Sequence, residues 1–540
     1  MKISIATVTL STLIIPAGLC LLLAACRPGT QQQTVKITPR NTAINESNAY
    51  NNLFLDSTDV EKFITKQQLN DTIANMMRSF YNARNFEYAW FDTRGLTEQA
   101  LGFRSLYDYS TDTGTVNKQL EARLNELAAE DDTTLSAHDA GIIKTELQLT
   151  RRFIDYAVHT FDDAGPELLE QFVPMQRHKT MELAAAVVSR DKDHGDNHPV
   201  YAKLKKRLPK YIDIAGKGGW PVITADKKKY RKGDHGPAVA AIRKRLQITG
   251  ELSGNDSLDV FDDALETAVK TYQQDLGHTP SGIVTDTIIM EMNAPVQARI
   301  RQLLMNMERM RWAPAEPEGR LIIINIPEFV LHVSEGKEKV FDMPVVVGRE
   351  GQHTTMFSGE LNQVVFNPYW HVPRSIVRKD ILPELAKNSN YLEENDMEVT
   401  GDRNGLPVIR QRPGEKNALG RVKFLFPNSF NIYLHDTPMK ELFKKDKRAY
   451  SHGCIRVSDP AKLAHYVLEG TSGWTPEKID SALSKGDKEK YVKVKSPIPV
   501  LIVYYTTWVD EQDKLQFRED IYGHDARLAQ KMFTDTPAAP

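Results

Sequence analysis

The sequence is poor in cysteine and has no excess of charge of either sign. Only three of the 540 residues are cysteines, at positions 20, 26 and 454, too few for a disulfide framework. Lys and Arg total 69 against 71 Asp and Glu, so the formal charge of -2 gives no long-range attraction to nucleic acid. Beyond residue 25 no stretch is apolar enough to span a bilayer. What is present is ordinary globular composition, at a length that predicts two to four domains.

The first 26 residues are typical of a secretory signal. An apolar run from Ile3 to Ala25 closes on Leu23-Ala24-Ala25-Cys26. This ending resembles the lipobox of bacterial lipoproteins, in which the cysteine is acylated, so Cys26 is the expected lipid anchor. The alternative is an uncleaved transmembrane helix over the same run. Residues 27–48 are polar and contain two prolines, which predicts a flexible tether.

Cys454 is the one thiol that remains if Cys20 leaves with the signal and Cys26 carries lipid. In an exported protein an unpaired cysteine is a liability unless it is buried or has chemistry to perform. A small buried core thiol is therefore the alternative to a reactive one.

The remaining pattern predicts a multidomain α+β protein. Residues 49–225 have helical periodicity, as in Leu120, Leu124 and Leu127, and predict an α-helical scaffold. A connecting helix over 297–318 leads to a mainly β domain over 319–525 and a tail over 526–540. The strand-like runs are Leu321–Ile326, Val330–Val333, Pro344–Val347, Val364–Phe366, Val422–Phe426 and Asn431–His435, with a closing hairpin around Asp510 to Asp513. A less strand-like stretch, about 378–404, is expected to form an inserted cap over a site.

Two short matches in the helical half do not predict sites. His194 and His198 lie four residues apart beside acidic residues, but Gly195 and Pro199 favour a polar turn over a metal-binding helix face. Residues 189–192 fit the S-x-x-K spacing of penicillin-binding enzymes without the other elements of that pattern. No metal site is predicted.

Residues 226–296 carry a pattern of three short helices. Tyr230-Arg-Lys-Gly-Asp-His-Gly-Pro-Ala-Val239 leads into the first, and Phe261-Asp-Asp-Ala-Leu-Glu-Thr-Ala-Val269-Lys-Thr-Tyr-Gln273 forms the second. These segments resemble the three-helix peptidoglycan-binding module of many wall enzymes, with Leu265 where Thr recurs and Tyr272 where Phe recurs. The resemblance implies wall binding. The alternative is a packed bundle whose sugar-binding groove has degenerated.

Candidate chemistry centres on Ser451-His452-Gly453-Cys454-Ile455-Arg456, which follows His435 at the end of a strand run. Cysteine attacks as a thiolate, so it needs a nearby imidazole or cationic surroundings. Gly453 has no side chain, which lets backbone N–H groups approach a reacting carbonyl as in an oxyanion hole. Asp436 is interpreted as a turn or capping residue, because adjacent residues on a strand point to opposite faces.

These residues match the signature of L,D-transpeptidases, the YkuD-type cysteine enzymes, which is a His followed at a set distance by Ser/Thr-His-Gly-Cys. The resemblance extends through Asn367-Pro-Tyr-Trp-His-Val-Pro-Arg374, the segment 410–421 and His435-Asp-Thr-Pro438. It points to the large periplasmic subgroup with a helical scaffold, a peptidoglycan-binding module and a capping subdomain. Arg456 stands where Asn is commonest in the family, although Arg suits that subgroup.

The resemblance implies a role for each residue of the site. Cys454 would be the nucleophile and His435 the base, with the other ring nitrogen of His435 held by a backbone carbonyl. The secondary roles are acceptor binding or thiolate support by His452, oxyanion contacts from Tyr433 and the amides of Gly453 and Cys454, and orientation of substrate carboxylates by Arg456.

The implied reaction is acyl transfer on peptidoglycan stem peptides, with no cofactor. The thiol attacks the third residue of a donor tetrapeptide, D-Ala leaves, and an acceptor amine resolves the thioester in a 3-3 cross-link. The implied location is the bacterial cell envelope, facing the periplasm and bound to the membrane through lipid on Cys26, with no nucleic-acid partner and with protein partners left open. Hydrolysis of the thioester, as in an L,D-carboxypeptidase, and an inactive wall-binding scaffold are the alternatives.

Overall fold

The computed structural model describes residues 35–110, 118–129, 135–161, 164–190, 195, 198–254, 257–313, 319–485 and 488–535. Cys20, Cys26 and His194 lie outside these residues, so the signal peptide and the lipid anchor stay predictions. Across the described part of the chain, none of the helices combines the length and the apolar character needed to cross a membrane.

The N-terminal helices form a unit with its own core. Its elements are α1 Ser57–Gln67, α2 Asp71–Ala83, β1 Phe91–Asp92, β2 Gly95–Leu96, α3 Glu98–Ser110, α4 Lys118–Ala129, α5 Ala140–Thr160 and α6 Pro166–Phe172. Side chains of Asp56, Asn70 and Asp139 accept backbone N–H groups at the first turns of α1, α2 and α5, which fixes where these helices begin. The core is aromatic and closes around Trp90 and Trp312, which are almost fully buried.

Residues 35–48 differ from the flexible tether expected for this stretch. Thr38 N donates to Ser79 Oγ at 2.9 Å, Asn41 N donates to Asn82 O at 2.9 Å, and the side chain of Ile44 is fully buried. The described part of this polar stretch is therefore bound to the surface of α2, because α2 offers hydrogen-bond partners that the sequence of the tether alone does not reveal.

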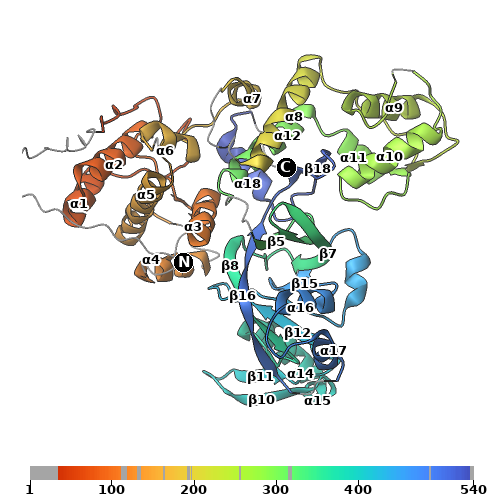
Figure 1. The fold of residues 1–540 in the computed structure, drawn as a ribbon. Coiled ribbons are helices and arrows are strands. Elements are labelled where there is room, and N and C mark those ends of the chain that lie inside the picture. Colours follow the sequence, from red (N-terminus) through yellow and green to blue (C-terminus); the bar gives the residue numbers. More distant parts are fainter. Residues whose placement is uncertain are drawn as a thin grey trace, which may run out of the picture.

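A second core joins segments that are far apart in the chain. It is built from α7 Thr180–Ser189, α8 Pro199–Gly216, β3 Lys229–Tyr230, α9 Pro237–Thr249, α10 Asp263–Asp275, β4 Val284–Thr285, α11 Asp286–Met292, α12 Val296–Met310, β17 Thr507–Val509, β18 Leu515–Phe517 and α18 His524–Met532. The predicted three-helix module and the hairpin around Asp510 to Asp513 are present. The predicted scaffold contributes to two cores, and Figure 1 shows α8 and α12 between the N-terminal helices and the module.

The β domain is a closed sheet around a third core, which confirms the predicted mainly β catalytic fold. The strands are β5 Arg320–Asn325, β6 Val330–Glu335, β7 Glu338–Gly348, β8 Phe357–Phe366, β12 Val422–Leu425, β13 Leu434–His435, β14 Ala449–Ser451, β15 Ile455–Val457 and β16 Lys490–Val503. Their order is β14-β7-β15-β13-β12-β8-β16-β5-β6, and β6 also pairs with β7, which closes the sheet. Helices α16 Pro460–Leu468 and α17 Pro476–Lys485 contribute to the same core.

An insertion leaves the sheet after β8 and returns at β12. It contains β9 Trp370–His371, α13 Arg374–Ile376, a π-helical turn Val377–Ile381, α14 Leu382–Lys387, α15 Tyr391–Glu394, β10 Met397–Asp402 and β11 Pro407–Gln411. Because β8 and β12 are hydrogen-bonded neighbours, the insertion begins and ends at one place on the sheet. It is wider than the predicted 378–404, since β9 and β11 belong to the same small sheet as β10. It lies at the end of the β domain farthest from the N-terminal helices and from the three-helix module (Figure 1).

Candidate active site

Two short parallel strands bring the predicted site residues together. In β13 and β15, Leu434 pairs with Ile455, and both side chains are fully buried in the core of the β domain. Since side chains alternate along a strand, the flanking residues lie on the opposite face. These flanking residues are Tyr433, His435, Cys454 and Arg456. Four of the six predicted residues therefore share one face.

His435 is held as a neutral imidazole with one free nitrogen. Its Nδ1 lies 2.5 Å from the backbone oxygen of Asp436, and because a carbonyl oxygen only accepts, Nδ1 carries the hydrogen. Burial, assisted by the positive charge of Arg456, lowers the pKa of His435 to about 3. At neutral pH the imidazole is thus uncharged, and Nε2 is available to take a proton.

The carboxylate of Asp436 is engaged elsewhere. It accepts the backbone N–H of Arg421 at 2.8 Å and of Thr437 at 2.7 Å, and Lys440 Nζ lies 2.6 Å from it. A Cβ at Gly420 would lie 2.3 Å from this carboxylate, so glycine is required there. Asp436 therefore orients His435 through its backbone oxygen, and its side chain stabilises the turn.

The thiol of Cys454 is partly exposed and surrounded by polar groups. Its Sγ lies 3.6 Å from the backbone oxygen of Asn431. Burial raises the pKa of Cys454, while hydrogen bonding from Tyr433 and the charge of Arg456 act in the opposite sense. Burial and the neighbouring Cys454 likewise raise the pKa of Tyr433, whose phenol stays protonated. At rest Cys454 is therefore a neutral thiol and His435 a neutral imidazole, on the same face of the two paired strands.

The loop before Cys454 is tied by Ser451 and Thr354. Ser451 Oγ donates to Cys454 O at 2.5 Å and accepts the N–H of Gly453 at 3.1 Å. The oxygen of Gly453 accepts from Thr354 Oγ1 at 2.8 Å. In this structure the Ser451 hydroxyl accepts the hydrogen of the Gly453 amide, and the role of that amide at an oxyanion stays a prediction. Gly453 is still required, since its φ is +111°.

His452 and Arg456 flank Cys454 in the sequence, two residues before it and two residues after it. His452 Nε2 is 3.3 Å from Arg349 Nη2 and 3.6 Å from Asp380 Oδ2, which comes from the π-helical turn of the insertion. Burial and the charge of Arg349 lower the pKa of His452. Arg456 donates from Nη1 to the sulfur of Met439 at 3.2 Å, and its buried Nε has no partner among the described residues.

Several residues around the site carry no signal in the sequence. Thr354, Arg349 and Asp380 lie outside any motif, and the contacts that bring them to the loop are long-range. Within the described ranges, no group of three or more His, Cys, Asp or Glu side chains is arranged to hold a metal ion.

Comparisons with known proteins give three matched regions. Residues 319–479 match the YkuD family, described as the L,D-transpeptidase catalytic domain. Residues 75–208 match a family described as the scaffold domain, and residues 235–292 match one described as "Putative peptidoglycan binding domain".

Similar proteins carry the same description. A "Putative L,D-transpeptidase" of Haemophilus influenzae is 31% identical over 244 residues, covering 42% of this chain and 49% of that protein, so the chain matches about half the length of its curated relative. Solved structures include an L,D-transpeptidase from Mycobacterium smegmatis, 14% identical with a TM-score of 0.20 over 34% of this chain and 58% of that one. Another, from Stackebrandtia nassauensis, is 12% identical with a TM-score of 0.21 over 52% and 97%. Structural likeness this low says nothing about activity.

Proposed function

Because this chain contains a YkuD-type L,D-transpeptidase catalytic domain, we propose that it forms 3-3 cross-links between peptidoglycan stem peptides through a thioester on Cys454. The observation that supports the proposal is the shared face of β13 and β15, which carries both a neutral imidazole with a free Nε2 and the one thiol of the described residues. A thiol and a base on adjacent strands are the minimum equipment for nucleophilic acyl transfer.

The first half-reaction forms the thioester. Nε2 of His435 takes the Sγ proton as Sγ of Cys454 attacks the carbonyl carbon of the third residue of a donor tetrapeptide. The tetrahedral intermediate then collapses, the C–N bond to D-Ala breaks, and the departing amine takes the proton from His435. Since both groups are neutral at rest, proton transfer accompanies attack and no thiolate accumulates beforehand.

The second half-reaction regenerates the thiol. An amine from the side chain of a neighbouring stem attacks the thioester carbon and gives its proton to His435, and the C–S bond breaks as the thiolate takes that proton back. The amide forms without ATP, because the thioester preserves the acyl potential of the peptide bond that was cleaved.

Oxyanion and substrate contacts are assigned to the remaining groups of the site. The Tyr433 hydroxyl and the Cys454 amide are assigned as donors to the developing oxyanion, since the Gly453 amide is already bonded to Ser451. Arg456, whose Nε is buried without a partner among the described residues, is assigned to a substrate carboxylate, the planar group that its guanidinium suits.

The insertion is assigned the role of a cap that keeps water from the thioester. This role is supported by the contact of Asp380, in the insertion, with His452, the residue directly before Gly453 and Cys454. Exclusion of water favours the amine over hydrolysis in the second half-reaction.

The protein is proposed to act in the bacterial cell envelope. The peptidoglycan-binding match over 235–292 supports a location at the wall. Lipid on Cys26 and a position facing the periplasm complete the proposal, on the strength of the lipobox-like Leu23-Ala24-Ala25-Cys26.

The acyl-enzyme is directly measurable. A chain that starts after Cys26 is mixed with disaccharide tetrapeptide, and its intact mass is compared with that of the Cys454→Ala variant. We expect an adduct of the tripeptide acyl group, with release of D-Ala, in the wild type alone. If the wild-type protein stays unmodified and the tetrapeptide stays intact, under conditions in which both proteins bind wall sacculi, the enzyme hypothesis is wrong. The protein would then be a wall-binding scaffold.

A further inference from the structure

The backbone oxygen of the residue before the nucleophile is fixed by a buried threonine. Thr354 Oγ1 donates to Gly453 O at 2.8 Å and accepts the N–H of Gly348 at 2.9 Å. Only 2% of Thr354 is exposed, so water does not compete for these bonds. The position of Cys454 relative to His435 therefore depends on where the segment 348–354 lies.

That segment is in turn held by Tyr522. The phenol of Tyr522 donates to Gly348 O at 2.6 Å and accepts from the N–H of Thr354 at 3.4 Å, so one hydroxyl joins the two ends of the segment. The Tyr522 ring stacks on His353 with centroids 4.1 Å apart. The backbone of the segment is closely packed at Gly348, because a Cβ there would lie 2.1 Å from the backbone oxygen of Gln352.

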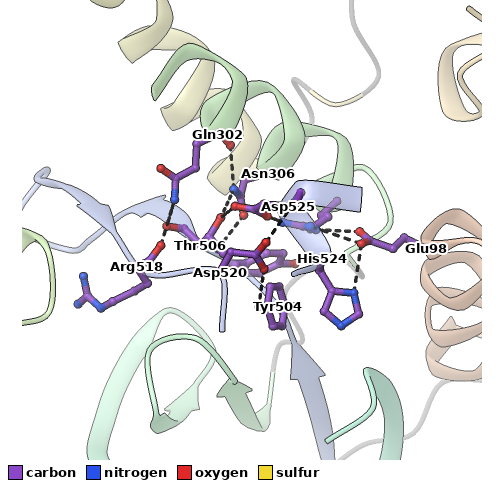
Figure 2. A network of polar contacts seen from close by, with 12 residues as sticks. Glu98, Gln302, Asn306, Tyr504, Thr506, Arg518, Asp520, His524 and Asp525 are labelled. Carbon is purple, nitrogen blue, oxygen red and sulfur yellow. Dashed lines mark hydrogen bonds and ion pairs between the residues drawn. The ribbon is translucent and has the colours of Figure 1, made fainter. Parts of the chain in front are cut away.

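Tyr522 is anchored by a polar network that continues away from the site. Its N–H donates to Tyr504 OH at 2.9 Å, and Tyr504 OH donates to Asp520 at 2.7 Å. Figure 2 shows Tyr504 and Asp520 beside the cluster of Thr506, Asp525 and Glu98 that connects the β domain to the helices. Within it, Arg309 of α12 donates to Glu98 of α3 at 2.9 Å and to Asp525 of α18 at 2.5 Å.

Tyr522 and its anchors Tyr504 and Asp520 lie outside the region that matches the catalytic family. Tyr522 lies 43 positions beyond residue 479, where that match ends. The C-terminal segment leaves the sheet at the end of β16, packs against α12, and brings the Tyr522 hydroxyl to the backbone oxygen of Gly348.

We propose that Tyr522 is a positioning residue for acyl transfer, acting through Thr354 and Gly453 to set the distance between the Cys454 thiol and His435. The inference rests on the proposed function, because its main readout is the rate of that reaction. A nucleophile and its base must be held within tenths of an ångström, and a misplacement of about 1 Å costs roughly 100-fold in rate. The same contacts couple the site to the junction between the β domain and the helices.

The test is Tyr522→Phe, which removes the hydroxyl and keeps the ring that stacks on His353. We expect kcat to fall about tenfold or more with KM within about twofold, because substrate contacts are untouched. Thr354→Val should act in the same direction, and the double variant should lose no more than the worse single variant, since both break one chain of contacts. The matched control is Tyr466→Phe, which deletes a tyrosine hydrogen bond to Glu335 in the same domain, a bond that shares no residue with this chain of contacts.

A second readout works even if the protein proves to have no transpeptidase activity. The rate of Cys454 alkylation by iodoacetamide at pH 7 should fall about threefold or more in Tyr522→Phe, because the thiol loses its aligned base. It should be unchanged in Tyr466→Phe. Equal alkylation rates in wild type and Tyr522→Phe would overturn the proposal, as would equal losses in the two phenylalanine variants. An inactive wild type with the alkylation difference intact would overturn the proposed function and leave the positioning role standing.

Discussion

Lowering the pH from 7 to 5 should leave the formation of the thioester on Cys454 almost unchanged in rate. The acid limb of the pH dependence of kcat/KM reports the pKa of the essential base in the free enzyme. In this protein the base is assigned to His435, whose pKa burial lowers to about 3, with Arg456 as the second cause.

The expected size of the effect follows from the neutral fraction of the imidazole. With the ordinary pKa of 6.5, a histidine is about three-quarters neutral at pH 7 and about 3% neutral at pH 5, a fall of roughly 25-fold. With a pKa of about 3, His435 is still about 99% neutral at pH 5. The two cases differ by more than tenfold in rate, which a single-turnover experiment resolves easily.

The assay follows the tripeptide adduct by intact mass at short times, with enzyme in excess, at both pH values. Circular dichroism at each pH controls for unfolding. His452→Asn is the matched control, because it removes the other histidine near the thiol and should leave the pH profile flat. A fall of 20-fold or more at pH 5 in both proteins would refute the assignment of a buried, neutral His435 as the base.

Three further predictions concern the surroundings of the site and the helical unit. Gly420→Ala should lower kcat about tenfold or more, because its Cβ would collide with Asp436, whose backbone oxygen orients the imidazole of His435, the proposed base. Gly233→Ala, with a similar positive φ but open space, should leave kcat unchanged. Asp380→Asn should raise the share of tripeptide over dimer among the products, measured by muropeptide mass analysis, if its contact closes the cap. Burial raises the pKa of Glu146 to about 7, so the folded state binds its proton more tightly and stability should fall by up to about 3 kcal/mol as the pH rises from 4.5 through 7. Hydrogen exchange of peptides from α5 should show this loss in wild type and a smaller one in Glu146→Gln.

Local patterns in the sequence predicted the individual helices and strands better than they predicted which of these elements pack together. Runs of strand-forming apolar residues identified β5, β6 and β12, and the turn residues around Asp510 to Asp513 identified the last hairpin, because both signals are contained in a few neighbouring residues. The division of the helices between two cores was missed. An apolar helix face predicts that another element packs on it, but it does not predict which element. The elements that share a core with α7 and α8 are α12 and α18, which come much later in the chain.

The candidate site shows the same limit. The Ser-His-Gly-Cys motif and His435 could be identified, because the residue types and their spacing along the chain form one pattern. The bond between Ser451 and the Gly453 amide was missed, since a hydroxyl can compete for a backbone N–H in several local geometries. Thr354 and Tyr522 had no signal in the sequence, because only the folded structure connects them to the loop. Thr354 lies 99 positions before Gly453, and Tyr522 lies 68 positions after Cys454.

The most direct test of the central claim is the identity of the cross-link. Purified disaccharide tetrapeptide is incubated with wild type and with Cys454→Ala, and the products are sequenced by tandem mass spectrometry. We predict dimers joined between the third residues of two stems, one equivalent of D-Ala released for each cross-link, and neither product with Cys454→Ala. Tripeptide without dimers would make the protein an L,D-carboxypeptidase, and dimers that form equally well without the thiol would contradict the role of Cys454.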